Sequence, residues 1–410
     1  MFDCIVVGGG ASGLICAGML AHSGMDCAIV ERLERVGKKI LSTGNGRCNL
    51  SNRQMTPAAF AGREEFVAGL FEAVPPETVL AHWQELGLLL QEEEGRIYPR
   101  SFQAASVLDV LRRSIACPQV TLMTGKKVTG IACRGDHYTI STGTGEHFSG
   151  RYMVLAAGGC AAPAMGTDGS LYPLLQDLGF RIESPVPSLV QVRSRHPLLP
   201  SLKGIRWRAE AVLISGEQVL GRDMGEVLFT DYGLSGIPIF QLSGEAARVL
   251  EAGGTAAVRL NLLPEFDEQA LPGLLRARAG RGSGENLQTL FTGIFPRMLA
   301  QAVIKSAGLS PTLPADQLQT SGIASLVRAI REMDFPLSGT RGFEQAQVTR
   351  GGVSTAQIDP ATMMSILYPR MYLVGELVDC DGPCGGYNLH FAAASGMAAA
   401  QSILKEDKKP

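Results

Sequence analysis

Residues 3–31 read DCIVVGGGASGLICAGMLAHSGMDCAIVE, and this stretch decides the fold. An apolar run is followed by a glycine turn, an amphipathic stretch and a second apolar run. That order predicts a β-strand, a tight turn, an α-helix that begins near Ala11, and a second strand. Gly8, Gly10 and Gly13 match the pattern GxGxxG. In that pattern the first glycine permits the turn, the second lets the backbone approach a pyrophosphate, and the third lets the helix pack against the strand.

The context of the glycines matters more than their number, because a chain with 49 glycines in 410 residues should contain roughly 0.7 chance matches to GxGxxG. Glu31 ends the second apolar run, where a carboxylate can accept hydrogen bonds from both ribose hydroxyls of a dinucleotide. The helix beginning near Ala11 would direct its free N–H groups at the phosphates. An acid at position 31 favours a ribose without a 2′-phosphate, and therefore FAD or NAD over NADP.

The sequence after Glu31 favours FAD. An NAD domain would continue with another strand and helix, whereas this chain runs into STGNGRCNLSN at 42–52, a polar glycine-containing stretch that is typical of a loop around a polar ligand. Three later clusters of glycine and small residues are further places where backbone can lie against a flat ligand. They are YMVLAAGG (152–159), RGGVST (350–355) and MYLVGELVDCDGPCGGYNLHFAAASG (371–396).

The composition indicates an ordinary globular protein of two or three domains. Of its 410 residues 45% are hydrophobic and 19% are charged, and the net charge is -2. This balance does not require a nucleic acid or an anionic membrane as a partner. The apolar N-terminus lacks a basic flank and is broken by glycines, so we interpret it as a buried strand and not as a targeting signal. No apolar stretch is long enough to predict a membrane span.

The nine cysteines are scattered singly along the chain, which favours a reducing cytoplasm and excludes a dense disulfide framework. Cys380 and Cys384 are one residue too far apart for a redox CxxC motif, so we interpret them as unrelated thiols in a loop. The six histidines form no metal-ligand spacing, and the sequence predicts no metal.

These motifs together resemble the BaiN/RdsA (YhiN-type) family of FAD-dependent oxidoreductases, within the glutathione-reductase-like flavoprotein fold, over nearly the whole chain. Many members of that family have Thr-Met-Glu-Ser-Lys where residues 362–366 here are Thr-Met-Met-Ser-Ile. The segments that carry the resemblance are VVGGGASGL (6–14), GKKILSTGNGRCNLSN (37–52), GRIYPRS (95–101), LAAGG (155–159), GEVLFTDYGLSG (225–236), RGGV (350–353) and GELVDCDGPCGGYNLHFAAASG (375–396).

The resemblance implies an FAD site to which residues from both ends of the chain contribute. Glu376 is expected either to accept hydrogen bonds from ribityl hydroxyls or to support its loop. The helix beginning near Gly386 is expected to direct its N-terminus at the flavin pyrimidine. The implied cofactor-binding residues are Gly8, Gly10, Ala11, Ser12, Gly13, Glu31, Arg32, Lys38, Lys39, Ser42, Thr43, Gly44, Asn45, Gly46, Arg47, Cys48, Asn49, Val128, Ala156, Ala157, Gly158, Gly352, Gly375, Glu376, Asp379, Gly385, Gly386, Tyr387, Asn388 and Leu389.

Four residues near the glycine clusters are candidate catalytic acids: Arg47, Arg350, Tyr387 and His390. Tyr387 is favoured as a flavin contact over an acid, and His390 as a helix histidine with a satisfied hydrogen bond over a proton donor. Cys48 has no second thiol at the spacing that a disulfide reductase needs, so packing is favoured over redox catalysis.

The expected fold class is α/β, with a discontinuous Rossmann-like FAD domain formed by residues 1–190 and 346–410. Residues 191–345 are expected to form an inserted β-rich module with a helical piece that selects the substrate. WRAEAVLIS (207–215) and GEVLFT (225–230) alternate like strands, and residues 269–279 and 317–333 have helical periodicity. The tail from Lys405 to Pro410 is expected to be disordered.

The resemblance implies hydride transfer through flavin N5, for which several substrates are open. The favoured activity is NADH- or NADPH-driven reduction of a C=C bond in a small molecule, such as a steroid-like acid. A uracil reductase acting on ribosomal RNA, a small-amine oxidase and a non-catalytic FAD protein are the alternatives. RNA is not favoured, because the arginines at 276, 278 and 281 are interpreted as a solvated cluster. No second GxGxxG occurs after residue 60, so a nicotinamide cofactor would visit the flavin transiently, and the sequence leaves the oligomeric state open.

Overall fold

The computed structural model describes residues 1–60, 62–280 and 285–408, and the chain divides into two compact units. The discontinuous unit comprises residues 1–187 and 346–410, and the inserted unit comprises 188–345. The sequence placed these boundaries after residues 190 and 345. Arg281 lies outside the described residues.

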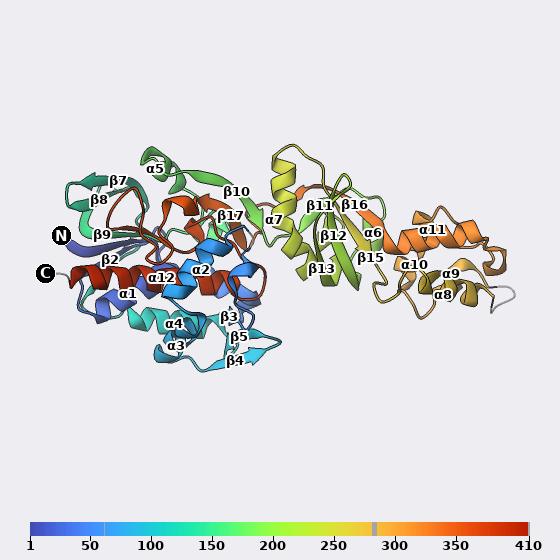
Figure 1. Ribbon diagram of the computed structural model, residues 1–410, viewed down its shortest axis with the longest axis horizontal. Helices are drawn as coiled ribbons and strands as arrows, with labels where there is room; N and C mark the ends of the chain where they lie inside the picture. The colour runs from blue at the N-terminus through green and yellow to red at the C-terminus, as the bar shows by residue number, and fades with distance from the viewer. Residues whose placement is uncertain (61, 281–284, 409–410) are drawn as a thin grey trace. The chain divides into compact units, whose positions relative to one another are not determined.

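A seven-stranded sheet forms the centre of the discontinuous unit (Figure 1). Six of its strands follow the order β6-β2-β1-β9-β8-β7, and the seventh, β18, also pairs with β9. The strands β6, β2, β1, β9 and β18 are parallel, as the predicted strand–helix–strand opening requires. The strands are β1 (Phe2–Val7), β2 (Cys27–Val30), β6 (Val120–Met123), β7 (Val128–Arg134), β8 (His137–Thr142), β9 (His147–Leu155) and β18 (Met371–Leu373).

The first and last helices of the chain pack against each other beside this sheet (Figure 1). Their contact is close because Gly396 of α12 has no side chain: an added Cβ would lie 2.5 Å from the Ser12 carbonyl oxygen of α1. The helices of the unit are α1 (Ala11–His22), α2 (Glu64–Ala73), α3 (Pro76–Glu85), α4 (Ala104–Ser114), α5 (Tyr172–Asp177) and α12 (Tyr387–Asp407).

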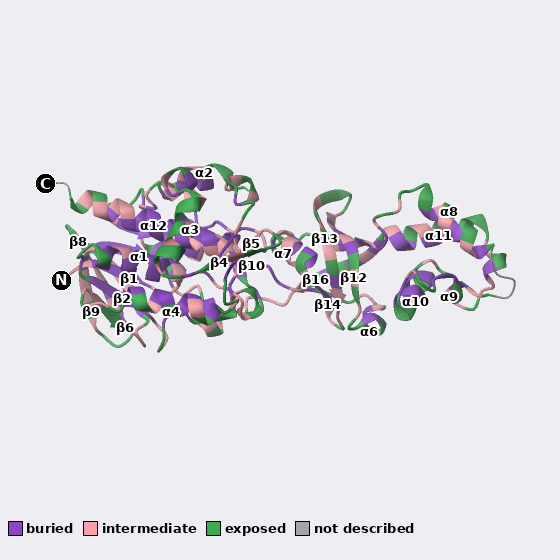
Figure 2. Ribbon diagram, turned by 90° about the horizontal axis from the view of Figure 1, so that it is seen from below, coloured by how far each residue is buried: buried purple, intermediate pink, exposed green. Residues whose placement is uncertain are grey.

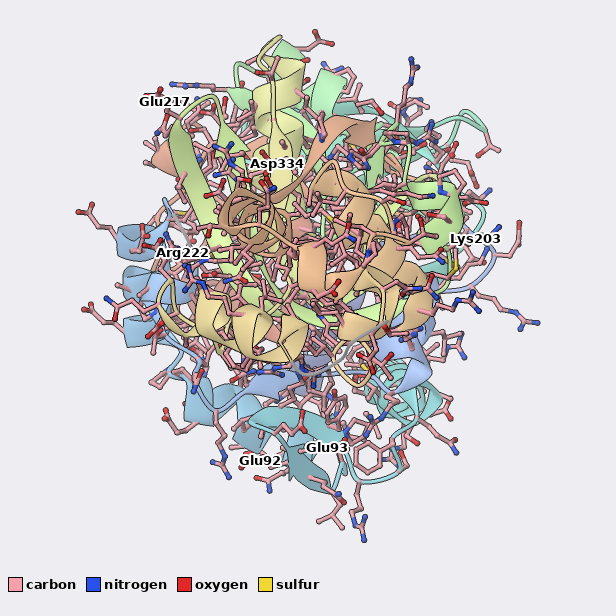
Figure 3. All side chains as sticks on the ribbon, turned by 90° about the vertical axis from the view of Figure 1, so that its right-hand side faces the viewer. Glu92, Glu93, Lys203, Glu217, Arg222 and Asp334 are labelled. Atoms are coloured by element: carbon pink, nitrogen blue, oxygen red, sulfur yellow. The ribbon has the colours of Figure 1, made fainter. Side chains whose placement is uncertain are left out.

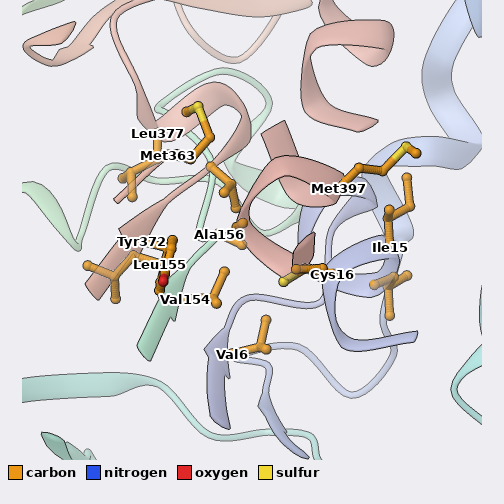
Figure 4. Close-up of a cluster of buried hydrophobic side chains, with 14 of the residues drawn as sticks. Val6, Ile15, Cys16, Val154, Leu155, Ala156, Met363, Tyr372, Leu377 and Met397 are labelled. Atoms are coloured by element: carbon orange, nitrogen blue, oxygen red, sulfur yellow. The ribbon is translucent and has the colours of Figure 1, made fainter. Parts of the chain in front are cut away.

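The core of the discontinuous unit lies where these two helices meet the parallel strands (Figures 2 and 4). Val6 of β1, Val154 of β9 and Tyr372 of β18 are fully buried, as are Cys16 of α1 and most of α12. Strands buried on both faces read as continuous apolar runs, which explains the uninterrupted CIVV and YMVL of the sequence.

Two small sheets complete the discontinuous unit. One joins β3 (Ser51–Asn52), β5 (Arg96–Pro99) and β4 (Leu90–Glu93), and the other pairs β10 (Ile182–Ser188) with β17 (Val348–Val353). The segments that leave and re-enter this unit therefore lie side by side.

The C-terminal tail is ordered further than the sequence indicated. Helix α12 continues to Asp407, where Arg151 lies 3.0 Å from the Asp407 carboxylate and Arg370 donates to Glu406 at 2.8 Å. These ion pairs to residues distant in sequence correct the expectation of disorder for residues 405–408, and residues 409–410 lie outside the described part of the chain.

The inserted unit is a closed six-stranded barrel in the order β11-β14-β13-β12-β15-β16, with a helical extension. The predicted strands lie in β12 and β13, and the predicted helical segments contain α8 and α11. Its elements are β11 (Val192–Ser194), α6 (Leu199–Leu202), β12 (Arg206–Ser215), β13 (Gln218–Phe229), β14 (Gly233–Ser235), α7 (Ile237–Glu251), β15 (Ala257–Asn261), α8 (Ala270–Ala279), α9 (Leu287–Leu290), α10 (Arg297–Ser306), α11 (Thr320–Arg331) and β16 (Met333–Thr340).

Several charged side chains of the barrel form ion pairs, and Figure 3 labels Lys203, Arg222 and Asp334 among them. Lys203 lies 2.6 Å from Asp231, Arg222 lies 3.6 Å from Glu210, and Arg259 forms a bidentate pair with Asp334. Across 188–345 the sixteen basic residues are nearly balanced by fifteen acidic ones. The inserted unit therefore has no strong excess of positive charge.

Candidate functional site: a dinucleotide cleft

A cleft of about 980 Å³, measured with its open mouth, lies at the carboxyl ends of the parallel strands of the discontinuous unit. It is formed where the β1–α1 turn, the end of β2, the segment after β9 and the start of α12 meet. In open α/β sheets this edge is where ligands bind. The predicted residues that line it are Gly8, Gly10, Ala11, Ser12, Glu31, Lys38, Lys39, Thr43, Ala156, Ala157, Gly158, Glu376, Asn388 and Leu389.

The glycine turn has the geometry that a diphosphate needs. A Cβ added at Gly10 would meet no atom within 4 Å, whereas one added at Gly13 would lie 2.1 Å from the Gly8 carbonyl oxygen. Gly13 thus serves the packing of α1 on β1, and Gly10 keeps the cleft open. Helix α1 begins without a side-chain cap, so its N-terminus presents free N–H groups and the positive end of its dipole.

Glu31 follows β2 and is buried at the edge of the cleft. Its Oε2 accepts from the Gly9 N–H and its Oε1 from the Leu33 N–H, both at 2.8 Å. These two bonds fix the carboxylate, and each oxygen keeps a lone pair for a ribose hydroxyl. The open space at Gly10, the uncapped helix and this carboxylate together fit the adenosine diphosphate half of FAD.

A polar network connects three segments on the other side of the cleft. Glu376 lies 2.5 Å from Lys39 Nζ through Oε2, and its Oε1 accepts from both the backbone N–H and the hydroxyl of Thr349 at 2.9 Å. The Thr349 hydroxyl oxygen in turn accepts from the backbone N–H groups of Cys160 and Ala161. Glu376 therefore supports the loops around the cleft as well as lining it.

The loop from 42 to 49 lies partly in the cleft and partly beside it. The Thr43 hydroxyl donates to the Ile40 carbonyl at 2.6 Å, and Asn45 and Cys48 have left-handed φ angles of 53° and 58°. Arg47 turns to the small sheet, where it pairs with Glu93 of β4 and stacks on Tyr98 and Phe102; Figure 3 labels Glu93.

The Cys48 side chain is fully buried. Burial raises the pKa of its thiol to about 11, although a hydrogen bond with Thr43 opposes the shift. A neutral, inaccessible thiol is consistent with packing and not with nucleophilic or redox chemistry.

The start of α12 borders the cleft through Asn388 and Leu389. The Asn388 side chain braces the preceding loop, accepting from the Gly382 N–H at 2.9 Å and donating to the Gly382 carbonyl at 2.8 Å. The cap residue Gly386 has a φ of 96°, and a Cβ there would lie 2.4 Å from the Ser51 carbonyl oxygen. The Tyr387 hydroxyl donates to the Gln54 carbonyl at 3.3 Å.

His390 lies in the core one turn further along α12. It is fully buried, its Nδ1 lies 2.9 Å from the Ser51 hydroxyl, and its ring meets Phe71 edge to face. Its Nε2 is buried and has no hydrogen-bond partner within the described part of the chain. Burial lowers the pKa of His390 to about 3, so the imidazole is neutral at physiological pH.

The RGGV turn and the loop before α12 contribute two arginine–aspartate pairs. Arg350 Nε lies 3.2 Å from Asp381, with both side chains mostly buried, and Arg63 binds the side chain and the carbonyl of the buried Asp379. Asp379 is thus engaged by Arg63, a residue that the sequence had not linked to the site.

The remaining predicted residues lie outside the lining of the cleft. Arg32 pairs with Asp168, and hydrogen bonds from Ser170 and Arg32 overcome burial to lower the pKa of Asp168 to about 2. The predicted residues that do not line the cleft are Gly13, Arg32, Ser42, Gly44, Asn45, Gly46, Arg47, Cys48, Asn49, Val128, Arg350, Gly352, Gly375, Asp379, Gly385, Gly386, Tyr387 and His390.

The cleft also contains residues that sequence reasoning missed. MGTDGS at 165–170 has the same glycine-plus-hydroxyl composition as the predicted loops and could have been identified by it. The missed lining residues are Gly9, Leu33, Arg35, Gly37, Ile40, Met165, Gly166, Thr167, Gln347, Val348, Cys380, Phe391 and Ala392.

No helix in the described residues combines the length and apolar composition needed to cross a bilayer.

Comparisons with known proteins identify the family of the chain. The family model described as HI0933-like protein Rossmann domain matches residues 2–402. The chain is 36% identical over 404 residues, 98% of each chain, to a 3-dehydro-bile acid delta(4,6)-reductase of Clostridium scindens. It is 26% identical over 414 residues, again 98% of each chain, to a ribosomal RNA dihydrouridine synthase of Escherichia coli.

The fold is shared with a solved 3-ketosteroid delta1-dehydrogenase from Sterolibacterium denitrificans, at a TM-score of 0.51 and 14% identity over 99% of both chains. At that identity the likeness shows the fold alone. The predicted Rossmann-type α/β fold is confirmed, and the chain belongs to the HI0933-like (BaiN/RdsA-type) family and is an FAD-dependent oxidoreductase.

Proposed function

We propose that this protein uses NADH or NADPH to reduce a conjugated C=C bond in a small apolar molecule, in a reducing cytoplasm. The observation that carries the proposal is the 36% identity, over 98% of both chains, to a relative named for the reduction of a bile acid. The nearly balanced charge of the inserted unit also favours a small molecule over a polyanion.

FAD, when bound, would accept a hydride from the nicotinamide and deliver it to the double bond. Lys39 and the N-terminus of α1 would hold its diphosphate, and Glu31 its adenosine ribose. The uncapped N-terminus of α12 would stabilise negative charge at the edge of the cleft near Asn388 and Leu389.

Of the four candidate acids, Arg350 is the one we propose to act on the substrate. It is 17% exposed, and its pairing with Asp381 would orient the guanidinium as a hydrogen-bond donor to a carbonyl conjugated with the double bond. Tyr387, which does not line the cleft itself, is proposed as a contact of the flavin end of the cofactor, Arg47 as a brace of its loop, and His390 as a core residue.

Reduction of uridine in ribosomal RNA is the second candidate, because two relatives of 26% and 25% identity are named ribosomal RNA dihydrouridine synthases. An RNA substrate needs a surface that neutralises several phosphates. On the barrel the arginines and lysine described above are instead paired with acids.

The test is an anaerobic titration of the FAD-loaded protein with NADH and with NADPH, followed by a steroid dienone acid, by uridine-containing RNA and by an amine. Bleaching of the flavin absorbance by a nicotinamide and its recovery with the dienone would support the proposal. Recovery with RNA alone would favour the second candidate. Bleaching by the amine alone would indicate an oxidase, and absence of any response would indicate a non-catalytic FAD protein.

A further inference from the structure

A second pocket lies in the helical part of the inserted unit, between α8 and α11, which contact each other (Figure 1). It measures about 780 Å³ with its open mouth. All of its lining residues belong to the inserted unit, whereas the dinucleotide cleft belongs to the discontinuous unit. The lining residues are Glu268, Pro272, Arg276, Thr320, Ile323, Ala324, Val327, Arg328, Arg331 and Glu332. We call this pocket the arginine groove.

Three arginines from the two helices converge on the arginine groove. Arg276 comes from α8, and Arg328 and Arg331 come from α11. Each lies in the last turn of its helix, where the dipole favours a cation. The dipole explains why arginines occur at these positions, but it does not explain why side chains of two helices line one pocket.

Arg331 supplies the observation that points to a ligand. Its Nη1 is buried and has no hydrogen-bond partner among the described residues, and its Nη2 lies 3.8 Å from Glu268, beyond hydrogen-bond distance. A buried N–H without an acceptor is costly, and a charged donor more so. Nη1 itself is closed to solvent, but 26% of the Arg331 side chain is exposed, and an anion in the groove would pair with the guanidinium through that exposed part, where Glu268 does not reach hydrogen-bond distance.

The rest of the lining limits what that anion can be. Pro272, Ile323 and Val327 form an apolar surface beside the arginines. The exposed carboxylates of Glu268 and Glu332 lie at the groove, and Arg328 lies 3.4 Å from Glu332. The repeated negative charges of a polyphosphate backbone would be repelled by these acids. A ligand with a single negative charge and an apolar body can instead place its charge beside the arginines and away from the acids.

We propose that the arginine groove binds a small amphipathic organic acid, whose carboxylate pairs with Arg331 and Arg328 and whose apolar body lies on Ile323 and Val327. The proposal does not rest on the reductase activity, because it concerns binding to a different unit of the chain.

The test uses the full-length, FAD-loaded protein and titrates decanoate by calorimetry, with decanol as the uncharged analogue. Decanoate is expected to bind at least about tenfold more tightly than decanol, since a charged hydrogen-bonded pair is worth that factor. Arg331→Gln should weaken decanoate binding about tenfold. Arg297→Gln, an exposed arginine of the neighbouring α10 outside the groove, should leave it unchanged.

A second variant guards against loss of folding in Arg331→Gln. Ala324 is an exposed helix residue of the groove, so Ala324→Glu should fold normally and repel the carboxylate. Equal binding of decanoate and decanol, or decanoate binding unaffected by both groove variants, would overturn the proposal. Displacement of decanoate by a short oligoribonucleotide that binds more tightly and needs Arg331 would overturn the assigned ligand class.

Discussion

At the scale of single residues, the Glu31 carboxylate is held at both oxygens. Both of its oxygens accept from backbone N–H groups, so the amide in Glu31→Gln would oppose one of those donors with its own NH₂. We expect the dissociation constant for FAD to rise at least about tenfold, as measured by flavin fluorescence during titration of the apoprotein. Glu34→Gln, a nearby exposed acid, is the matched control. An unchanged constant in Glu31→Gln would exclude the ribose role.

The buried His390 leads to a prediction about how the free energy of unfolding depends on pH. Because burial lowers its pKa to about 3, the unfolded state binds the extra proton first as the pH falls below 6.5. Its contribution to stability is present above pH 6.5 and is lost as the pH falls toward about 3, by about 2 kcal/mol between pH 6.5 and pH 5.

The measurement is the free energy of unfolding in urea at both pH values. His390→Gln can keep the bond to Ser51 without titrating, so this part of the pH dependence should disappear in it. His147→Gln, at an exposed histidine, should retain it. If the wild-type protein and the His390→Gln variant had the same pH dependence, His390 would not be the group responsible for the loss of stability at low pH.

At the scale of elements, two glycines of the β1–α1 turn have different roles. One is needed for folding and the other for cofactor binding, so substitutions at the two positions should have different effects. In Gly13→Ala the new Cβ would lie 2.1 Å from the Gly8 carbonyl oxygen, so we expect the free energy of unfolding of the apoprotein to fall by about 3 kcal/mol. In Gly10→Ala the Cβ meets open space, and the loss should stay within about 1 kcal/mol.

Gly10→Ala should nevertheless weaken FAD binding at least about tenfold, because its methyl group occupies the approach to the diphosphate. Urea unfolding of the apoprotein and FAD titration distinguish the two effects. If Gly10→Ala bound FAD normally, the diphosphate would have to lie elsewhere.

The same turn shows what could be predicted from sequence. The strand, turn, helix and acid lie within 31 consecutive residues and follow from local patterns, and the structure has them where they were expected. The bracing of Glu376 by Thr349 and Lys39 joins segments up to 337 residues apart, and no local pattern encodes it. Arg47 was assigned to the cofactor, whereas Tyr98, Phe102 and Glu93 hold it at the small sheet, a contact that only the fold creates.

At the scale of the whole molecule, the pairing of β10 with β17 makes the inserted unit removable in principle. We expect a protein in which a short Gly/Ser linker replaces residues 191–344 to bind FAD, because every lining residue of the cleft lies outside that range. It should show no acceptor-dependent recovery of flavin absorbance, since we assign substrate choice to the removed part. Loss of FAD would instead show that the cofactor site needs the inserted unit, and retained turnover would refute the substrate role.

The packing of α12 on α1 has a consequence for synthesis on the ribosome. The inserted unit is continuous in sequence, so all of its strands and helices have emerged before β18 and α12 are translated. The discontinuous unit, by contrast, lacks the partner of its first helix until α12, which begins at Tyr387, has been synthesised. The barrel can therefore fold while the chain is still growing, and the cofactor site can be completed only after α12 has left the ribosome.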